Sequence, residues 1–296
     1  MTRIPALRPI TFKNVLFVTD FSSSSEIALP HAIALAAGYE GKVYIAHVIT
    51  PQLYELVPPD FVPEVLRQSA AYAERRMERL VKESEFGAVP YETLIEQGEL
   101  WETLRCVAGQ YAIDLIALGT GGRRGLQEVL MGAVAEEILR LATIPVLTVG
   151  PESREPPPEG EPRCVLLAND FSANCVQAVA SADSLAHKFG ARLISLHVAP
   201  EGAEDPETTT RLEQFFLQRL EQSLNVTAFQ HKQLDFRVDF GVPADSILKF
   251  AAEHGTDLIV MGVRGAGSVT QGTCHLGRNA YRVVSEARCP VLAVPG

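Results

Sequence analysis

The sequence is poor in the features that mark membrane-spanning, disulfide-rich and nucleic-acid-binding proteins. It has no apolar run of the roughly 18 residues that cross a bilayer, so we expect no membrane partner. Its five cysteines are odd in number and form no CxxC pair, which favours free thiols in a reducing cytoplasm over disulfides or a zinc site. The net charge of −10 leaves no basic excess for a nucleic-acid partner. The first residues carry two arginines but no apolar core, so we expect no signal peptide.

What the sequence does contain is an internal repeat. VLFVTDFS at 15–22 is similar to VLLANDFS at 165–172, and DLIALGTGG at 114–122 is similar to DLIVMGVRG at 257–265. IPVLTVG at 144–150 likewise matches CPVLAVPG at 289–296. Blocks repeated in one order predict a domain duplication. The stretch between the copies is rich in Pro, Gly and Glu, so we predict a first domain at 1–150, a linker at 151–162 and a second domain at 163–296.

Short apolar runs alternate with amphipathic stretches in each copy. In the first copy we predict strands at 15–18, 42–49, 89–95, 115–118 and 146–149, and helices at 27–36, 64–84, 101–111 and 128–142. The charged residues of 64–84, among them Arg76, predict a solvated helix face. This alternation predicts a parallel sheet with helices on both faces, and such sheets bind ligands outside the carboxyl ends of their strands.

The loop after the fourth predicted strand is rich in glycine. Gly119 and Gly122 are followed at a distance by Gly132, which opens an amphipathic run. Glycine lets the backbone approach a ligand closely, and a helix N-terminus attracts anions. Arg123 and Arg124, between these glycines, could reach phosphate oxygens. Tight turns after a strand are the alternative explanation.

Polar residues also follow the first predicted strand. Asp20 could accept hydrogen bonds from ribose hydroxyls or an adenine amine, or it could cap the next helix. The serines at 22–25 are explained by helix capping. His47 and His197 occupy matching strand positions, and we interpret both as structural because no pattern typical of a catalytic triad accompanies them.

Together these motifs resemble the universal stress protein family. The resemblance rests on VLFVTDFSSSSEIAL, the AHVI end of the second strand, the spaced glycines and the closing IPVLTVG, and it covers about 12–150 and about 163–296. It implies an α/β fold of two tandem doubly wound domains, each a five-stranded parallel sheet of order 3-2-1-4-5 flanked by helices. It also implies ATP or AMP at the strand ends of domain 1, with Mg²⁺ beside the phosphates.

The resemblance assigns nucleotide contacts to particular residues of the first copy. Asp20 would lie near ribose or adenine, the Val48 backbone against the adenine edge, and the glycines around the phosphates. The full set of nucleotide-binding residues is Val18, Thr19, Asp20, Val48, Gly119, Gly122, Arg123, Gly132, Ala133 and Val134. The family has Ser or Thr where this chain has Ala133. The loss of one hydrogen bond to a charged group lowers affinity roughly ten- to a hundred-fold, while the backbone N–H groups remain.

The second copy departs further from the family pattern. It keeps Asp170, Gly262 and Gly265, but the spacing that leads to the last glycine ends at His275. Gly277 comes two residues later and is followed by Arg278. We therefore predict a degenerate phosphate loop in the second domain.

Three functions remain open. The first is a non-enzymatic stress-response protein in which an adenine nucleotide, held in domain 1, sets conformation or partner binding. The second is a weak ATPase, and the third is a nucleotide-free scaffold in which both sites are vestigial. The closing strands, 146–149 and 291–294, could pair within one chain or between the two chains of a homodimer.

Overall fold

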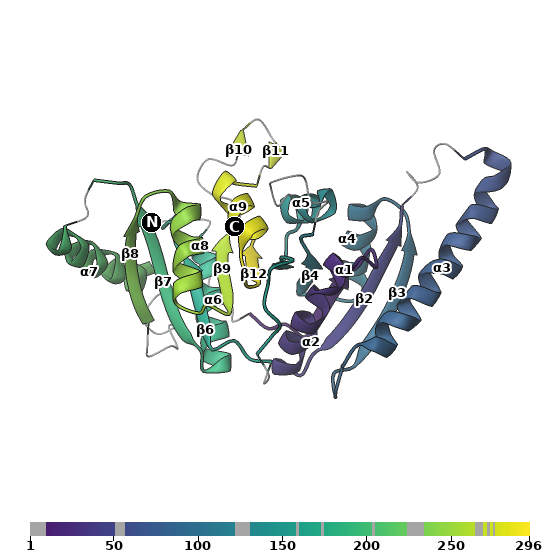
Figure 1. Ribbon diagram of the computed structural model, residues 1–296, viewed down its shortest axis with the longest axis horizontal. Coiled ribbons are helices and arrows are strands. Elements are labelled where there is room, and N and C mark those ends of the chain that lie inside the picture. The colour runs from purple at the N-terminus through teal and green to yellow at the C-terminus, as the bar shows by residue number, and fades with distance from the viewer. Residues whose placement is uncertain are drawn as a thin grey trace.

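The computed structural model forms one ten-stranded sheet flanked by helices (Figure 1). It describes residues 10–50, 57–121, 131–157, 160–172, 175–202, 205–223, 234–263, 269–270, 273–274 and 276–296. No helix among these residues is both long enough and apolar enough to span a membrane.

The first half, residues 1–150, alternates strands with helices as predicted. Its elements are β1 (Asn14–Val18), α1 (Ser23–Glu26), α2 (Ala28–Gly38), β2 (Lys42–Ile49), the 3-10 turn η2 (Pro59–Phe61), α3 (Val62–Glu83), β3 (Tyr91–Gln97), α4 (Leu100–Gln110), β4 (Leu115–Gly119), α5 (Ala133–Leu141) and β5 (Val146–Val149). The five strands are parallel and lie in the order β3-β2-β1-β4-β5.

The second half, residues 163–296, repeats this architecture. Its elements are β6 (Cys164–Ala168), α6 (Val176–Phe189), β7 (Arg192–Ala199), α7 (Pro206–Ser223), β8 (Leu234–Phe240), α8 (Pro243–Glu253), β9 (Leu258–Gly262), β10 (Val269–Thr270), β11 (Thr273–Cys274), α9 (Arg278–Glu286) and β12 (Val291–Val294). The parallel order β8-β7-β6-β9-β12 mirrors the first half. The small β10–β11 hairpin was not predicted from the sequence.

Alternate residues of the strands pack on opposite faces of the sheet, as strand geometry requires. Val15 and Phe17 of β1 join the core on the face covered by α2, α3 and α6, whereas Leu16 and Val18 join the core on the other face. Each of these cores contains residues of both halves, so the core is continuous along the sheet.

The halves meet where β5 runs antiparallel to β12 in the middle of the sheet. Thr148 of β5 is buried and donates its hydroxyl to the Val291 carbonyl over 3.1 Å. Helices α2 and α6 also meet here: a Cβ on Gly38 would lie 2.2 Å from the ring of Phe189. That contact explains a glycine at the end of α2. Helices α3 and α7 lie at the two far ends of the molecule (Figure 1).

Candidate functional site

Hydrogen bonds fix the turn that leaves β1 in the first half. Thr19 donates its backbone N–H to the Ala46 carbonyl of β2 over 3.0 Å. Its hydroxyl lies 2.9 Å from the Ser25 hydroxyl and accepts the Phe21 N–H over 2.9 Å. Phe21 has a φ of +60°, a left-handed conformation that is uncommon for a residue other than glycine. The turn thus brings Asp20 to the exposed carboxyl edge of the sheet.

Asp20 closes this turn but does not cap the helix. Its Oδ1 accepts the Ser22 N–H over 2.9 Å, whereas the Ser22 side chain is the N-cap of α1 and accepts the Ser25 N–H over 3.1 Å. Capping by the serines is therefore confirmed, and capping by Asp20 is wrong. Burial raises the pKa of Asp20, but hydrogen bonds from Ser22 and Ser25 outweigh burial and hold the pKa below its usual value.

His47 stabilises the same turn, as a structural histidine would. Its Nδ1 lies 2.9 Å from the Thr19 carbonyl, and its ring packs against Phe21 at a centroid distance of 4.4 Å. In the second half His197 makes the matching contact with the Asn169 carbonyl, also at 2.9 Å. Both histidines join the end of the second strand in their half to the turn after the first.

Arg76 of α3 also holds the turn, which the sequence did not indicate. It is half-buried, and its Nη2 donates to the Phe21 carbonyl and lies 3.3 Å from Oε1 of Glu26. The prediction that Arg76 belongs to a solvated face is wrong. The helical pattern held one signal for this contact: Arg76 lies one turn from Ala73 and from Leu80, and both of these are buried.

Two glycines, Gly119 at the end of β4 and Gly121 just after it, are required by close packing within the protein. A Cβ on Gly119 would lie 2.0 Å from the Ser24 carbonyl oxygen, and a Cβ on Gly121 would lie 2.1 Å from Ser24 Cβ. These two glycines therefore let α1 pack against the end of β4. The predicted phosphate contacts Gly122 and Arg123, together with Arg124, lie outside the described residues.

Gly132 is the N-cap of α5, with φ −65° and ψ 145°. Its N–H donates to the Thr120 carbonyl over 3.2 Å, and no side chain caps the helix. The helix begins at Ala133 rather than at 128, because Met131 pairs with Gly121 in a β-bridge. Ala133 and Val134 are exposed at this N-terminus, where backbone N–H groups have no acceptor within the helix.

Gly277 occupies the matching position in the second half. It is the N-cap of α9 with φ −59° and ψ 142°, again without a side-chain cap. The expectation that His275 replaces the last glycine is therefore wrong, because the second-half loop is two residues longer and still ends on glycine. His275 and Gly265 themselves lie outside the described residues.

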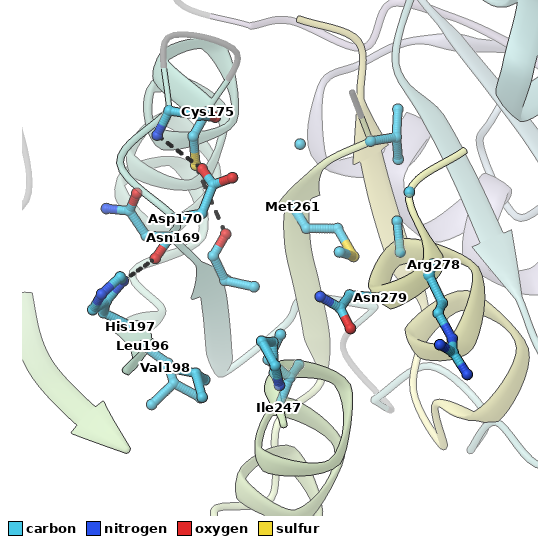
Figure 2. Close-up of a pocket in the computed structure, with 17 residues that line it drawn as sticks. Asn169, Asp170, Cys175, Leu196, His197, Val198, Ile247, Met261, Arg278 and Asn279 are labelled. Atoms are coloured by element: carbon cyan, nitrogen blue, oxygen red, sulfur yellow. Dashed lines mark hydrogen bonds between the residues drawn. The ribbon is translucent and has the colours of Figure 1, made fainter. Parts of the chain in front are cut away.

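A cavity of about 210 Å³ lies at the carboxyl edge of the second half (Figure 2). It is bounded by the ends of β6, β7 and β9 and by the first residues of α8 and α9. In Figure 2 the Asn279 side chain points towards Met261 and Ile247, and the Arg278 side chain extends away from the wall formed by Asp170 and Cys175.

The walls of this cavity are the second-half counterparts of the predicted nucleotide contacts. Aligning the repeated blocks pairs Val18, Thr19, Asp20, Val48, Gly119, Gly132, Ala133 and Val134 with Ala168, Asn169, Asp170, Val198, Gly262, Gly277, Arg278 and Asn279. Every one of these counterparts lines the cavity. The second half thus brings together the counterparts of eight of the ten positions that the sequence analysis selected in the first half.

The chemistry of the walls differs between the halves. Where Thr19 and Ser25 share a hydrogen bond, the second half has Asn169 and Cys175. The Cys175 thiol turns to the Ala168 carbonyl at 3.8 Å, and burial raises its pKa to about 12. The buried Nδ2 of Asn169 has no hydrogen-bond partner among the residues that the structure describes. Among the described residues, no group of three His, Cys, Asp or Glu side chains could hold a metal ion.

Comparisons with known proteins agree with this architecture. The model of the universal stress protein family matches residues 11–150 and again 162–295. A universal stress protein of Thermus aquaticus is 38% identical over 137 residues, which span 45% of this chain and 98% of that protein. One of Methanocaldococcus jannaschii is 28% identical over 155 residues, which span 47% of this chain and 96% of that protein.

A solved structure matches nearly the whole chain. The crystal structure of a universal stress protein from Archaeoglobus fulgidus has a TM-score of 0.74 at 21% identity, covering 96% of this chain and 98% of that one. That likeness shows a shared fold across both halves. With the family model matched twice along its length, the chain belongs to the universal stress protein family, as a member with two tandem domains.

Proposed function

We propose that this protein is a non-enzymatic stress-response protein that binds an adenine nucleotide in its first domain, residues 1–150, and uses it to set conformation or partner binding. The observation that carries the proposal is the uncapped N-terminus of α5 at Gly132 together with the exposed carboxylate of Asp20, because their second-half counterparts, Gly277 and Asp170, line one cavity. Free backbone N–H groups at a helix N-terminus favour phosphate. The same arrangement encloses a cavity in the second half.

Different residues at the carboxyl edge of the first half would meet different parts of a nucleotide. The carboxylate of Asp20 would accept hydrogen bonds from ribose hydroxyls, and the Val48 backbone would meet the adenine edge. The N–H groups of Ala133 and Val134 would bind phosphate, with Gly122 and Arg123 beside them and Mg²⁺ accompanying the phosphates. Since Ala133 lacks the hydroxyl that the family has here, we expect weak binding.

The position of Asp20 argues against a hydrolytic role. Hydrogen bonds hold its pKa below the usual value, and a carboxylate with a low pKa is a poor general base. A ribose-binding carboxylate needs only to be ionised and fixed, and the Ser22 N–H fixes it. We therefore propose binding without turnover.

The second domain, residues 163–296, would act as an internal partner with its own ligand preference. Its cavity presents Arg278 and Asn279 where the first domain has Ala133 and Val134. The β5–β12 pairing would make the chain a pseudo-dimer that is monomeric in solution. Light scattering on the purified protein tests this, since a homodimer would contradict it.

Titration of the full chain with AMP and ATP, followed by calorimetry, tests the nucleotide proposal. We expect Asp20→Ala to lower affinity at least about tenfold and Ala133→Ser to raise it about tenfold, because each changes one hydrogen bond to a ligand. Asp170→Ala is the matched control in the other half and should leave affinity unchanged.

Three results would overturn the proposal. Loss of binding in Asp170→Ala with retention in Asp20→Ala would move the nucleotide to the second half. No binding at millimolar nucleotide would favour a scaffold. Phosphate release that disappears in Asp20→Ala would make the protein an ATPase.

A further inference from the structure

A second hollow, of about 360 Å³, lies at the amino edge of the second-half strands, opposite the 210 Å³ cavity. Its walls include Thr256 and Cys289, which come just before β9 and β12. The C-terminal half of α8, the end of α9 and the linker complete it. Because parallel strands enter the sheet here and leave at the other edge, this amino-edge cavity is separate from the 210 Å³ cavity of the second half. Since β5 runs antiparallel to β12, the amino-edge cavity lies on the same edge of the sheet as the carboxyl ends of the first-half strands, but none of the predicted nucleotide contacts that the structure describes lines it.

Three cationic side chains from three segments line the amino-edge cavity. Arg154 comes from the linker, Lys249 from α8 and Arg288 from the turn between α9 and β12. All three are exposed, and none forms an ion pair with another residue that the structure describes. In a chain of net charge −10, three cations around one hollow without carboxylate partners are unexpected.

The acidic side chain on the wall is already engaged. Glu286 lies 3.2 Å from Nε of Arg282, which also bonds Asp245 at 2.7 Å. The charge of Glu286 is therefore largely balanced by Arg282, which lies outside the cavity wall. The wall also contains Thr256, which is buried.

Backbone contacts fix the linker at this place. The Arg154 N–H donates to the Arg288 carbonyl over 3.2 Å, so the two arginines are held next to each other. The Arg154 carbonyl lies 3.0 Å from Nε2 of His31, which is buried in the first half. Arg154 thus joins a helix of the first half to the cavity wall of the second.

Helix ends offer a simpler explanation for part of this cluster. α8 ends at Glu253 and α9 at Glu286, and cations near helix C-termini interact favourably with the terminal carbonyls. That accounts for Arg288, two residues beyond α9, but not for Lys249, which lies outside the last turn of α8. It does not account for Arg154, which belongs to no helix and brings a third positive charge to the same hollow.

We propose that the amino-edge cavity binds a small polyanion of the phosphate class, held by Arg154, Lys249 and Arg288. Charge-assisted hydrogen bonds from guanidinium and ammonium groups to phosphate oxygens would supply the binding free energy. Because Arg154 belongs to the linker, the bound anion would tie the linker to the second half.

Inorganic pyrophosphate, titrated into the full chain and followed by amide NMR and calorimetry, tests the proposal. We expect the largest shifts at the amides of Arg154, Lys249 and Arg288. Lys249→Gln and Arg288→Gln should each lower affinity about tenfold, as the loss of one charged hydrogen bond predicts. Arg140→Gln is the matched control, because it removes an exposed cation from the last turn of α5, far from this cavity.

The remaining outcomes each contradict the proposal. Equal losses in Arg140→Gln and Arg288→Gln would mean that only net charge matters. Shifts at the N-termini of α5 or α9 without shifts at Arg154 would place the anion in the nucleotide crevices. Unchanged affinity in both cavity variants, with lowered stability, would leave the cations as partners of helix ends.

Discussion

The two halves keep the same backbone frame at the carboxyl edge and differ in the side chains that fill it. In both, a histidine at the end of the second strand lies 2.9 Å from the carbonyl of the residue after the first strand. In both, a phenylalanine in the following turn has a positive φ, +60° at Phe21 and +57° at Phe171. This comparison teaches that backbone contacts preserve the crevice while the lining side chains are free to change.

The lining has changed most at the helix N-terminus. Gly132 and Gly277 have nearly the same backbone angles, yet Ala133 and Val134 follow the first and Arg278 and Asn279 the second. At this N-terminus the first half therefore presents only backbone N–H donors among its described residues. The second offers the same donors with a cation and an amide close by.

The largest expected effect is the loss of stability when Gly119, which is closely packed, is replaced. Gly119→Ala would place a Cβ 2.0 Å from the Ser24 carbonyl oxygen, a backbone atom that cannot rotate away. We expect a loss of about 3 kcal/mol or more in the free energy of unfolding, because overpacking forces the backbone to move. Urea denaturation followed by circular dichroism measures it.

Gly277→Ala in the second half is the control for this prediction. A Cβ there meets nothing within 4 Å, and φ is −59°, so the change should cost about 1 kcal/mol or less from the weaker N-cap. Similar losses in the two variants would contradict the assignment of Gly119 to internal packing.

The sequence predicted the scaffold well because strands and helices follow from periodic burial. The strands at 42–49 and 146–149 have the predicted bounds, and the helix predicted at 64–84 runs from Val62 to Glu83. These elements depend on residues that are close in sequence, so a local pattern suffices.

The errors concern features that a periodic pattern does not encode. The start of α5 was placed too early because the Gly121–Met131 bridge is not a periodic signal. His275 was aligned with Gly132 because spacing was counted from Gly265, whereas the N-cap of α9 is Gly277, at the end of a loop that is two residues longer. Arg76 contacts a carbonyl 55 positions away, which no local pattern encodes.

Acid should destabilise the first half through His31. Burial lowers the pKa of His31 to about 4 from 6.5, so the unfolded chain binds the proton more readily at pH values between these two. Stability should therefore fall as the pH drops through this window. The loss attributable to His31 is about 2 kcal/mol between pH 7 and pH 5.

Comparison with His31→Gln isolates this effect from other titrating groups. Glutamine can still donate to the Arg154 carbonyl but does not titrate, so the variant should lose about 2 kcal/mol less than the wild-type protein over the same range. The counterpart of His31 in the second half is Ser181, which is buried and donates to the Gln177 carbonyl. Parallel pH curves for variant and wild type would contradict the prediction.

The smallest expected effect comes from exchanging the matching residues Ser25 and Cys175, which differ only in the oxygen or sulfur atom of the side chain. Ser25→Cys should cost about 1 kcal/mol, because the hydroxyl that pairs with Thr19 at 2.9 Å and donates to the Ser22 carbonyl is lost. Cys175→Ser should change the free energy of unfolding by about 0.5 kcal/mol or less, since a serine hydroxyl could donate to the Ala168 carbonyl that the thiol contacts at 3.8 Å. Urea midpoints of the two variants measure the difference. If both exchanges destabilise equally, the two turns tolerate their residues for reasons of packing alone.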